Sequence, residues 1–262
     1  MPPILAHIVE AARATLPGLG ARRGELERLA RETPPGPDFA AALRGERVAL
    51  IAEVKRRSPS AGTINAGLDP IAHAARYAEG GAAAISVLTE GPHFGGSVDD
   101  LVAVRSRVGV PVLRKDFILD ELQLIEARAL GASAALLIVR ILSPERLERL
   151  IAFSRDLQLA TLVETHTAAE IDVALTAGAE IIGVNSRDLD DFTLDPDSAW
   201  QLLADLPSDR LAVAESAMHT LGDVEQAAAA GADAVLIGTA LSSAADPATA
   251  VREFASVVHR AR

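Results

Sequence analysis

The sequence predicts an α/β protein: a (β/α)8 barrel (TIM barrel) with an N-terminal helical extension. From about residue 47 the chain repeats one unit eight times, made of a short apolar run, a polar loop and an amphipathic segment. The runs are rich in Val, Ile, Leu and Ala, which is typical of parallel strands buried on both faces. No GxGxxG turn follows an early strand, as an open dinucleotide-binding sheet would require. Eight such units in 262 residues fit a closed barrel.

Each unit carries start and stop signals. The expected strands span residues 48–55, 83–88, 110–115, 134–139, 159–164, 180–185, 210–215 and 234–238. A capping side chain before a proline predicts four helix starts: Asp69-Pro70, Ser143-Pro144, Asp195-Pro196 and Asp246-Pro247. Capping-box spacing predicts three more: Ser97 with Asp100, Thr167 with Glu170, and Thr220 with Asp223. Helix ends are expected at Gly80-Gly81, Gly131, Gly178 and Gly231.

Residues 1–46 stand outside this repeat. Ile4, Ile8, Val9 and Ala12 fall on one face of a helix, and a second amphipathic pattern surrounds Leu26. We expect residues 1–46 to form a helical extension packed on the barrel. Residues 47–262 would then form the barrel itself, which is the catalytic domain.

The composition argues against several classes of function. A net charge of −11 disfavours nucleic acid and acidic membranes as partners, because both bind basic surfaces. No run of 18 apolar residues could span a membrane, and the N-terminus lacks a signal-peptide pattern. Without cysteine there is no disulfide or thiol catalysis. We expect a cytoplasmic monomer or weak homodimer that acts on a small substrate.

The six histidines form no helical i, i+4 pair, so we expect no metal site. His166 near Glu164 is the one candidate ligand pair. We expect His166 to be an ordinary loop residue.

Only two of the 25 basic residues are lysines, Lys55 and Lys115. Arginine-biased codon usage would explain why lysine is scarce, but not where the two remaining lysines stand. Lysine can release its proton in a suitable environment, whereas arginine effectively cannot. Proton-donor chemistry would therefore keep lysine where structure alone would accept arginine.

Polar side chains gather where the expected strands end. Strand side chains alternate between the barrel interior and the helix layer, and catalytic groups lie at the C-terminal strand ends. In residues 48–55 the alternate set that includes Glu53 and Lys55 must face the interior, because the other set is wholly apolar. The same phase brings six residues to one mouth: Glu53, Lys55, Lys115, Glu164, Asn185 and Glu215. One such residue could be a solvated strand end, but six in phase indicate acid–base chemistry.

A phosphate site is expected in the loops after the seventh and eighth strands, where TIM barrels usually place it. Ser216-Ala217 follow the seventh strand, and Gly238-Thr239 open a segment long enough for one helical turn. Backbone N–H groups there would hold an anion, and Arg187 would supply a charge. The alternative for Gly238 is a tight loop without a ligand.

Six stretches carry a family resemblance: IAEVKRRSPS (51–60), HFGGS (93–97), LRKDF (113–117), LVE (162–164), GVNSRDL (183–189) and AES (214–216). They resemble indole-3-glycerol phosphate synthase. The resemblance implies conversion of 1-(2-carboxyphenylamino)-1-deoxyribulose 5-phosphate into indole-3-glycerol phosphate, CO2 and water. It implies no cofactor, because proton transfers alone suffice.

The resemblance also implies a role for each site residue. Lys115 would be the general acid on the ketone, Lys55 would pair with the substrate carboxylate, and Glu164 would serve in the dehydration. The remaining residues would hold hydroxyls and lysines (Glu53, Asn185, Glu215, Ser216), clamp the anthranilate ring (Pro59, Phe94, Phe117) or bind phosphate (Ser58, Arg187, Ala217, Gly238, Thr239).

Two positions depart from the family pattern. Ala217 stands where glycine usually follows the Glu-Ser pair, and Thr239 where serine or glutamate is common. Alanine would serve without strain if its φ is negative, which is the milder case that we expect; a positive φ would strain the loop.

Two alternatives stay open. One is another phosphate-binding barrel isomerase of tryptophan or histidine biosynthesis. Phosphoribosylanthranilate isomerase itself is expected to use a Cys/Asp pair, which this chain lacks. The other is a non-catalytic barrel subunit, which would not explain six intact polar strand ends.

Overall fold

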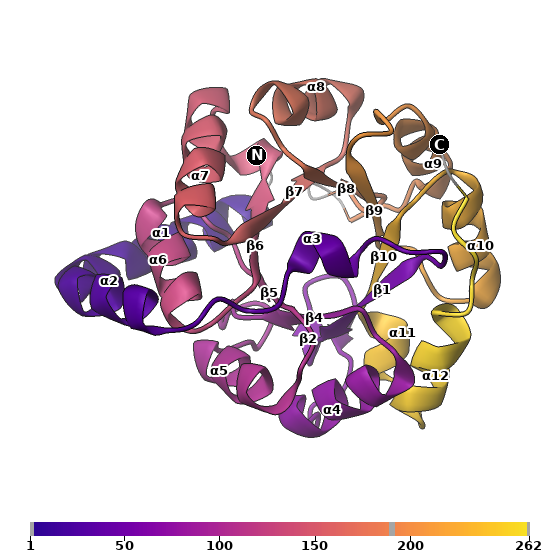
Figure 1. Cartoon of the computed structure of the whole chain (residues 1–262), viewed down its shortest axis with the longest axis horizontal. Coiled ribbons are helices and arrows are strands. Elements are labelled where there is room, and N and C mark those ends of the chain that lie inside the picture. Colours follow the sequence, from indigo (N-terminus) through magenta and orange to yellow (C-terminus); the bar gives the residue numbers. More distant parts are fainter. Residues whose placement is uncertain (1–2, 189–191, 261–262) are drawn as a thin grey trace.

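The computed structural model describes residues 3–188 and 192–260 and confirms the (β/α)8 barrel. Eight parallel strands close in the order β1-β10-β9-β8-β7-β6-β5-β4, ringed by helices (Figure 1). The strands are β1 Ala49–Val54, β4 Ala84–Leu88, β5 Val112–Lys115, β6 Ala134–Ile138, β7 Ala160–Thr165, β8 Ile181–Asn185, β9 Leu211–Glu215 and β10 Ala234–Ile237. Each overlaps a predicted run closely. A small antiparallel hairpin, β2 Arg57–Ser58 with β3 Gly62–Thr63, has no predicted counterpart.

The helix layer consists of α4 Pro70–Gly80, α5 Val98–Arg107, α6 Glu121–Ala129, α7 Pro144–Asp156, α8 Ala168–Thr176, α9 Pro196–Ala204, α10 Leu221–Ala229 and α12 Pro247–Phe254. Two short helical turns, η1 Val139–Ile141 and α11 Thr239–Ser242, follow β6 and β10. The four predicted starts before proline are confirmed, since each Asp or Ser accepts a backbone N–H of the first turn. The glycines at 81, 131, 178 and 231 have positive φ after their helices, as expected.

Two of the three expected capping boxes are wrong in detail. The box at Thr220 forms in full. Ser97 does cap α5, but Asp100 pairs with Arg56 at 2.5 Å instead of closing the box. At Thr167 the N3 residue Glu170 accepts the His166 N–H instead of the N–H of Thr167. Arg56 thus takes the first carboxylate from a distant part of the chain, and the residue just before the cap takes the second.

The predicted phase of the strands is correct. Val48 and Leu50 belong to the apolar cluster between strands and helices. Ile51, Leu113 and Leu162 belong to the cluster that fills the barrel. The alternation therefore directs the polar strand ends into the mouth of the barrel.

The N-terminal extension is helical, as expected, with α1 Pro3–Ala21, α2 Arg23–Glu32 and α3 Phe39–Ala42. α1 and α2 lie on one side of the barrel, where Leu26 of α2 packs in one cluster with Ile125 of α6 (Figure 1). Phe39 and Leu43 belong to the interior cluster together with residues that begin strands, such as Ala84. α3 therefore closes the barrel at the N-terminal ends of the strands. Within the described ranges, no helix has the length and apolarity to cross a membrane.

Candidate active site

A cavity of about 250 Å³ opens at the C-terminal ends of the strands. Every residue that the sequence assigned to catalysis or substrate binding lines it: Glu53, Lys55, Ser58, Pro59, Phe94, Lys115, Phe117, Glu164, Asn185, Arg187, Glu215, Ser216, Ala217, Gly238 and Thr239. The lining also includes Ser60, Asp116, Phe192, Met218 and His219, which were not assigned.

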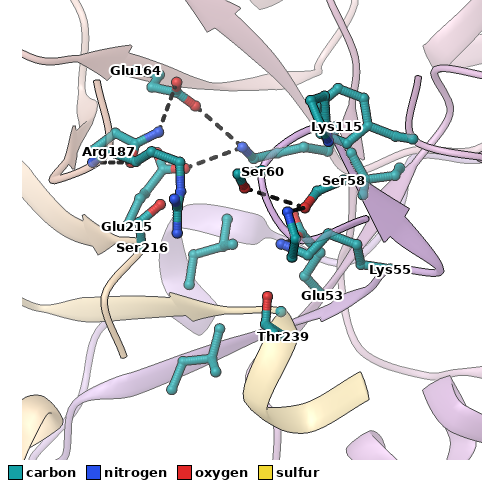
Figure 2. Close-up of a pocket in the computed structure, with 18 of the residues that line it drawn as sticks. Glu53, Lys55, Ser58, Ser60, Lys115, Glu164, Arg187, Glu215, Ser216 and Thr239 are labelled. Atoms are coloured by element: carbon teal, nitrogen blue, oxygen red, sulfur yellow. Dashed lines mark hydrogen bonds and ion pairs between the residues drawn. The ribbon is translucent and has the colours of Figure 1, made fainter. Parts of the chain in front are cut away.

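Lys115, the last residue of β5, lies at the centre of this site. Its Nζ is 3.2 Å from Glu164 Oε2 and 3.3 Å from Glu215 Oε2, and both carboxylates point toward it (Figure 2). Asn185 donates from Nδ2 to Glu164 Oε1 at 3.1 Å. Apart from the contact with Lys115, neither Glu215 oxygen has a hydrogen-bond partner in the described part of the chain. Glu215 can therefore still accept hydrogen bonds from a ligand.

Burial and neighbouring charges both shift the pKa values of Lys115, Glu164 and Glu215. Burial alone would lower the pKa of Lys115, but Glu164, Glu215 and Glu53 together raise it above its ordinary value. Burial alone would raise the pKa of Glu164, yet Lys115, His166 and Asn185 lower it. Burial raises the pKa of Glu215, and the charge of Glu164 adds to this effect against the opposing charge of Lys115. The site thus holds a protonated lysine, an ionised Glu164 and a Glu215 that binds protons more readily than an ordinary glutamate.

The second lysine forms a separate pair at the end of β1. Lys55 Nζ lies 3.0 Å from Glu53 Oε1, and the two side chains lie together in Figure 2. Gly238, after β10, leaves room for them, because a Cβ there would lie 2.9 Å from Lys55 Nζ and would overlap Glu53 Oε1. The hydroxyl of Ser242 in α11 accepts from Lys55 N at 3.3 Å and donates to Glu53 O at 3.2 Å.

A second glycine makes room for Glu215. Gly183 of β8 faces the barrel interior, and a Cβ there would overlap Glu215 Oε1 and lie 3.2 Å from its Cδ. Glycine is the residue that leaves this volume free for the carboxylate.

Hydroxyl and guanidinium groups line another part of the cavity. Arg187 donates to Phe192 O at 3.2 Å, and no described carboxylate forms an ion pair with it. Burial lowers the pKa of Arg187, although a guanidinium keeps its charge. Ser58 and Ser60 lie 3.4 Å apart at their Oγ atoms in the β2–β3 hairpin, and Thr239 begins α11. A cation that has no counter-ion among the described residues, near several hydroxyls, suits an anionic group.

Two aromatic rings line the cavity. Phe94 and Phe117 have ring centroids 6.0 Å apart. Glu90 fixes the first ring by accepting the backbone N–H groups of His93 and Phe94, both at 2.8 Å. Gln123 fixes the second by donating to Phe117 O at 3.0 Å. The backbone that carries each ring is therefore held by a polar side chain close to it in sequence.

Comparison with known proteins agrees with this geometry. A family model described as indole-3-glycerol phosphate synthase matches residues 5–254. Indole-3-glycerol phosphate synthase 2 of Streptomyces coelicolor is 47% identical over 251 residues, covering 95% of this chain and 97% of that protein. The indole-3-glycerol phosphate synthase of Mycobacterium ulcerans is 45% identical over 253 residues, covering 96% and 93%.

The chain belongs to the indole-3-glycerol phosphate synthase family. This membership decides against another barrel isomerase. Among solved structures, 3-hexulose-6-phosphate synthase from Salmonella typhimurium has a TM-score of 0.64 at 17% identity, covering 79% of this chain and 97% of that one. Such a distant likeness concerns the barrel fold alone.

The departure from the family pattern at Ala217 corrects one expectation. Its φ is 54°, and the preceding Ser216 has φ 66°, so both residues occupy the left-handed region. The expectation of a negative φ is wrong. The loop keeps the backbone path that glycine adopts freely, and alanine holds it at a cost of about 1–2 kcal/mol.

Next to one family motif, a contact was not foreseen. His166 directly follows β7, as a loop residue would, but its side chain is buried between Glu164 and Glu170. The four-residue spacing between His166 and Glu170 was a possible signal. Glu170 does not close the capping box at Thr167, so its carboxylate can accept the His166 N–H. Leu189, which ends the GVNSRDL motif, lies outside the described residues.

Proposed function

We propose that the chain converts 1-(2-carboxyphenylamino)-1-deoxyribulose 5-phosphate into indole-3-glycerol phosphate, CO2 and water. The observation that carries this proposal is the protonated Lys115 between two buried glutamates, which faces the same cavity as the Lys55–Glu53 pair. Family membership supports the same reaction. A non-catalytic subunit would have no use for this costly set of buried charges.

Ring closure would need a proton donor and a counter-charge. The ring carbon that bears the carboxylate bonds to the ketone carbon, and the carbonyl oxygen takes a proton from Lys115. Lys55 would pair with the substrate carboxylate. Loss of CO2 leaves its bonding electron pair to restore the aromatic ring.

Dehydration completes the indole. The new hydroxyl leaves as water after taking a proton, and the neighbouring ring carbon loses one. Glu164 would exchange these protons, since it is ionised and hydrogen-bonded to Lys115 and Asn185. Glu215 and Ser216 would accept or donate to substrate hydroxyls.

The two ends of the substrate would bind to chemically different parts of the cavity. Phe94, Phe117 and Pro59 would hold the anthranilate ring. The phosphate would bind to Arg187, Ser58, Ala217, Gly238 and Thr239, with the Arg187 guanidinium as the main charge.

Indole fluorescence and CO2 release on mixing the protein with the carboxyphenylamino substrate test the reaction. Lys115→Ala is expected to lower turnover by roughly 10²–10⁴-fold, the usual effect of losing a general acid. Lys115→Arg should restore little, because arginine keeps the charge but holds its proton. Near-normal turnover by the arginine variant would contradict proton donation by Lys115.

A further inference from the structure

A histidine lies behind Glu164, between two carboxylates. Its Nε2 is 3.5 Å from Glu164 Oε1, and its Nδ1 is 3.2 Å from Glu170 Oε2. The His166 side chain is only 3% exposed and does not line the cavity. Any effect of His166 on a bound substrate must therefore pass through Glu164.

The contacts of Glu170 assign one proton of the imidazole. Glu170 accepts from Arg140 Nε at 3.0 Å and from the backbone N–H of His166. Burial opposes its charge, but the hydrogen bonds from His166 and Arg140 lower the pKa of Glu170, so it is ionised. An ionised carboxylate only accepts hydrogen bonds, so Nδ1 of His166 carries a proton.

That assignment leaves Nε2 facing Glu164 Oε1. Nε2 is buried and has no hydrogen bond to a described residue. A bare imidazole lone pair against a bare carboxylate would be repulsive, and protons on both atoms would collide. The stable arrangements place one proton between the two atoms, either on Nε2 or on Oε1.

Glu164 thus has two faces. Lys115 contacts Oε2 on the cavity side, and Asn185 of β8 donates to Oε1. His166 approaches Oε1 from the side of α8, supported by Glu170 and, through it, by Arg140 of η1. These charged groups, together with the Asn185 amide, decide where the shared proton lies.

We propose that His166 is a positioning residue that exchanges one proton with Glu164 during the dehydration step. This rests on the proposed function. Since Glu164 is ionised, the shared proton starts on Nε2. Its transfer to Oε1 lets Glu164 give a proton to the leaving hydroxyl, which departs as water. Glu164 then takes the proton from the ring carbon, and return of a proton from Oε1 to Nε2 restores the starting state. Over one turnover the pair neither gains nor loses a proton.

His166→Gln and His166→Asn test this exchange, with His7→Gln on the exposed face of α1 as the matched control. The amides donate hydrogen bonds but do not pass a proton on. We expect kcat to fall roughly 10–100-fold with KM within about twofold, as for other residues that act through a catalytic group. The pH profile of kcat should change shape, and His7→Gln should match the wild type. Activity within twofold of wild type, or a uniform loss with an unchanged profile, would overturn the proposal.

Nitrogen NMR of His166 provides a readout that needs neither turnover nor a His166 variant. We expect a proton on Nδ1 in the wild type, and a change at Nε2 in Glu164→Gln, whose amide donates to it. A neutral ring protonated on Nε2 and bare at Nδ1 would overturn the proposal. If the wild-type protein fails to form indole, the proposed function is wrong, whereas this NMR result still reports on the proton between Glu164 and His166.

Discussion

Gly183→Ala should inactivate the site while leaving the fold intact. The added Cβ would lie 3.2 Å from Glu215 Cδ, 3.3 Å from Leu162 Cδ1, and inside the contact distance of Glu215 Oε1. The obstacle is the far end of a flexible side chain, so the carboxylate can retreat without moving the strand. A retreat of about 1 Å would take Glu215 out of reach of Lys115, which it now contacts at 3.3 Å.

The size of the effect follows from that displacement. A misplacement of about 1 Å can cost on the order of 100-fold in rate. Moving a side-chain end costs the fold little, so we expect a change in unfolding free energy of about 1 kcal/mol or less. The variant should therefore separate activity from stability.

Initial rates of indole formation and thermal unfolding measure the two effects. Gly109→Ala is the matched control, because a Cβ at this loop position meets nothing within 4 Å. Turnover by Gly183→Ala within threefold of wild type would refute the idea that Gly183 makes room for Glu215. A large loss of stability would refute the view that the side chain alone moves.

Three further changes test the other parts of the site. Lys55→Arg should keep partial activity in steady-state kinetics, because a charge–carboxylate pair survives the exchange; damage equal to that of Lys115→Arg would contradict this role. Ala217→Gly should lower KM severalfold at most with kcat unchanged, and raise the melting temperature by about 2–4 °C per kcal/mol of released strain; weaker binding of a phosphorylated product analogue in calorimetry would mean that the loop is built around the methyl group. Glu215→Gln should gain thermal stability over the wild type as pH rises from 5 to 8. Burial raises the pKa of Glu215 to about 8, so the stability that its neutral form contributes is lost as pH rises through that pKa. A stability difference between variant and wild type that does not change with pH would contradict this.

Periodicity predicted the barrel well, because buried parallel strands leave a strong signal in sequence. The phase argument at Glu53 and Lys55 placed the polar strand ends correctly, since the alternate set is uniformly apolar. It needed only the alternation of side chains along a strand. The capping boxes at Ser97 and Thr167 were less predictable. Arg56 reaches Asp100 from a distant part of the chain, and the backbone N–H of His166 competes for Glu170 with the cap residue itself.

The features that were not predicted from the sequence depend on the three-dimensional arrangement of the chain. Gly183 is an ordinary strand glycine in the sequence, and its role is visible only once Glu215 of the next strand lies beside it. The sign of φ at Ala217 is set by the loop that joins β9 to α10, not by alanine itself, which disfavours that region. His166 was assigned to a loop correctly, but burial of its ring depends on the path of α8.

The placement of the two lysines has a chemical consequence. Their side chains are 17% and 14% exposed, and both line the cavity, whereas every other basic residue is an arginine. An amine-reactive reagent therefore meets the terminal amine and two ε-amino groups that a bound substrate would cover. Lys115 is held protonated by Glu164 and Glu215, and a protonated amine is not a nucleophile. Coupling the protein to a support through its amines should therefore leave Lys115 unmodified.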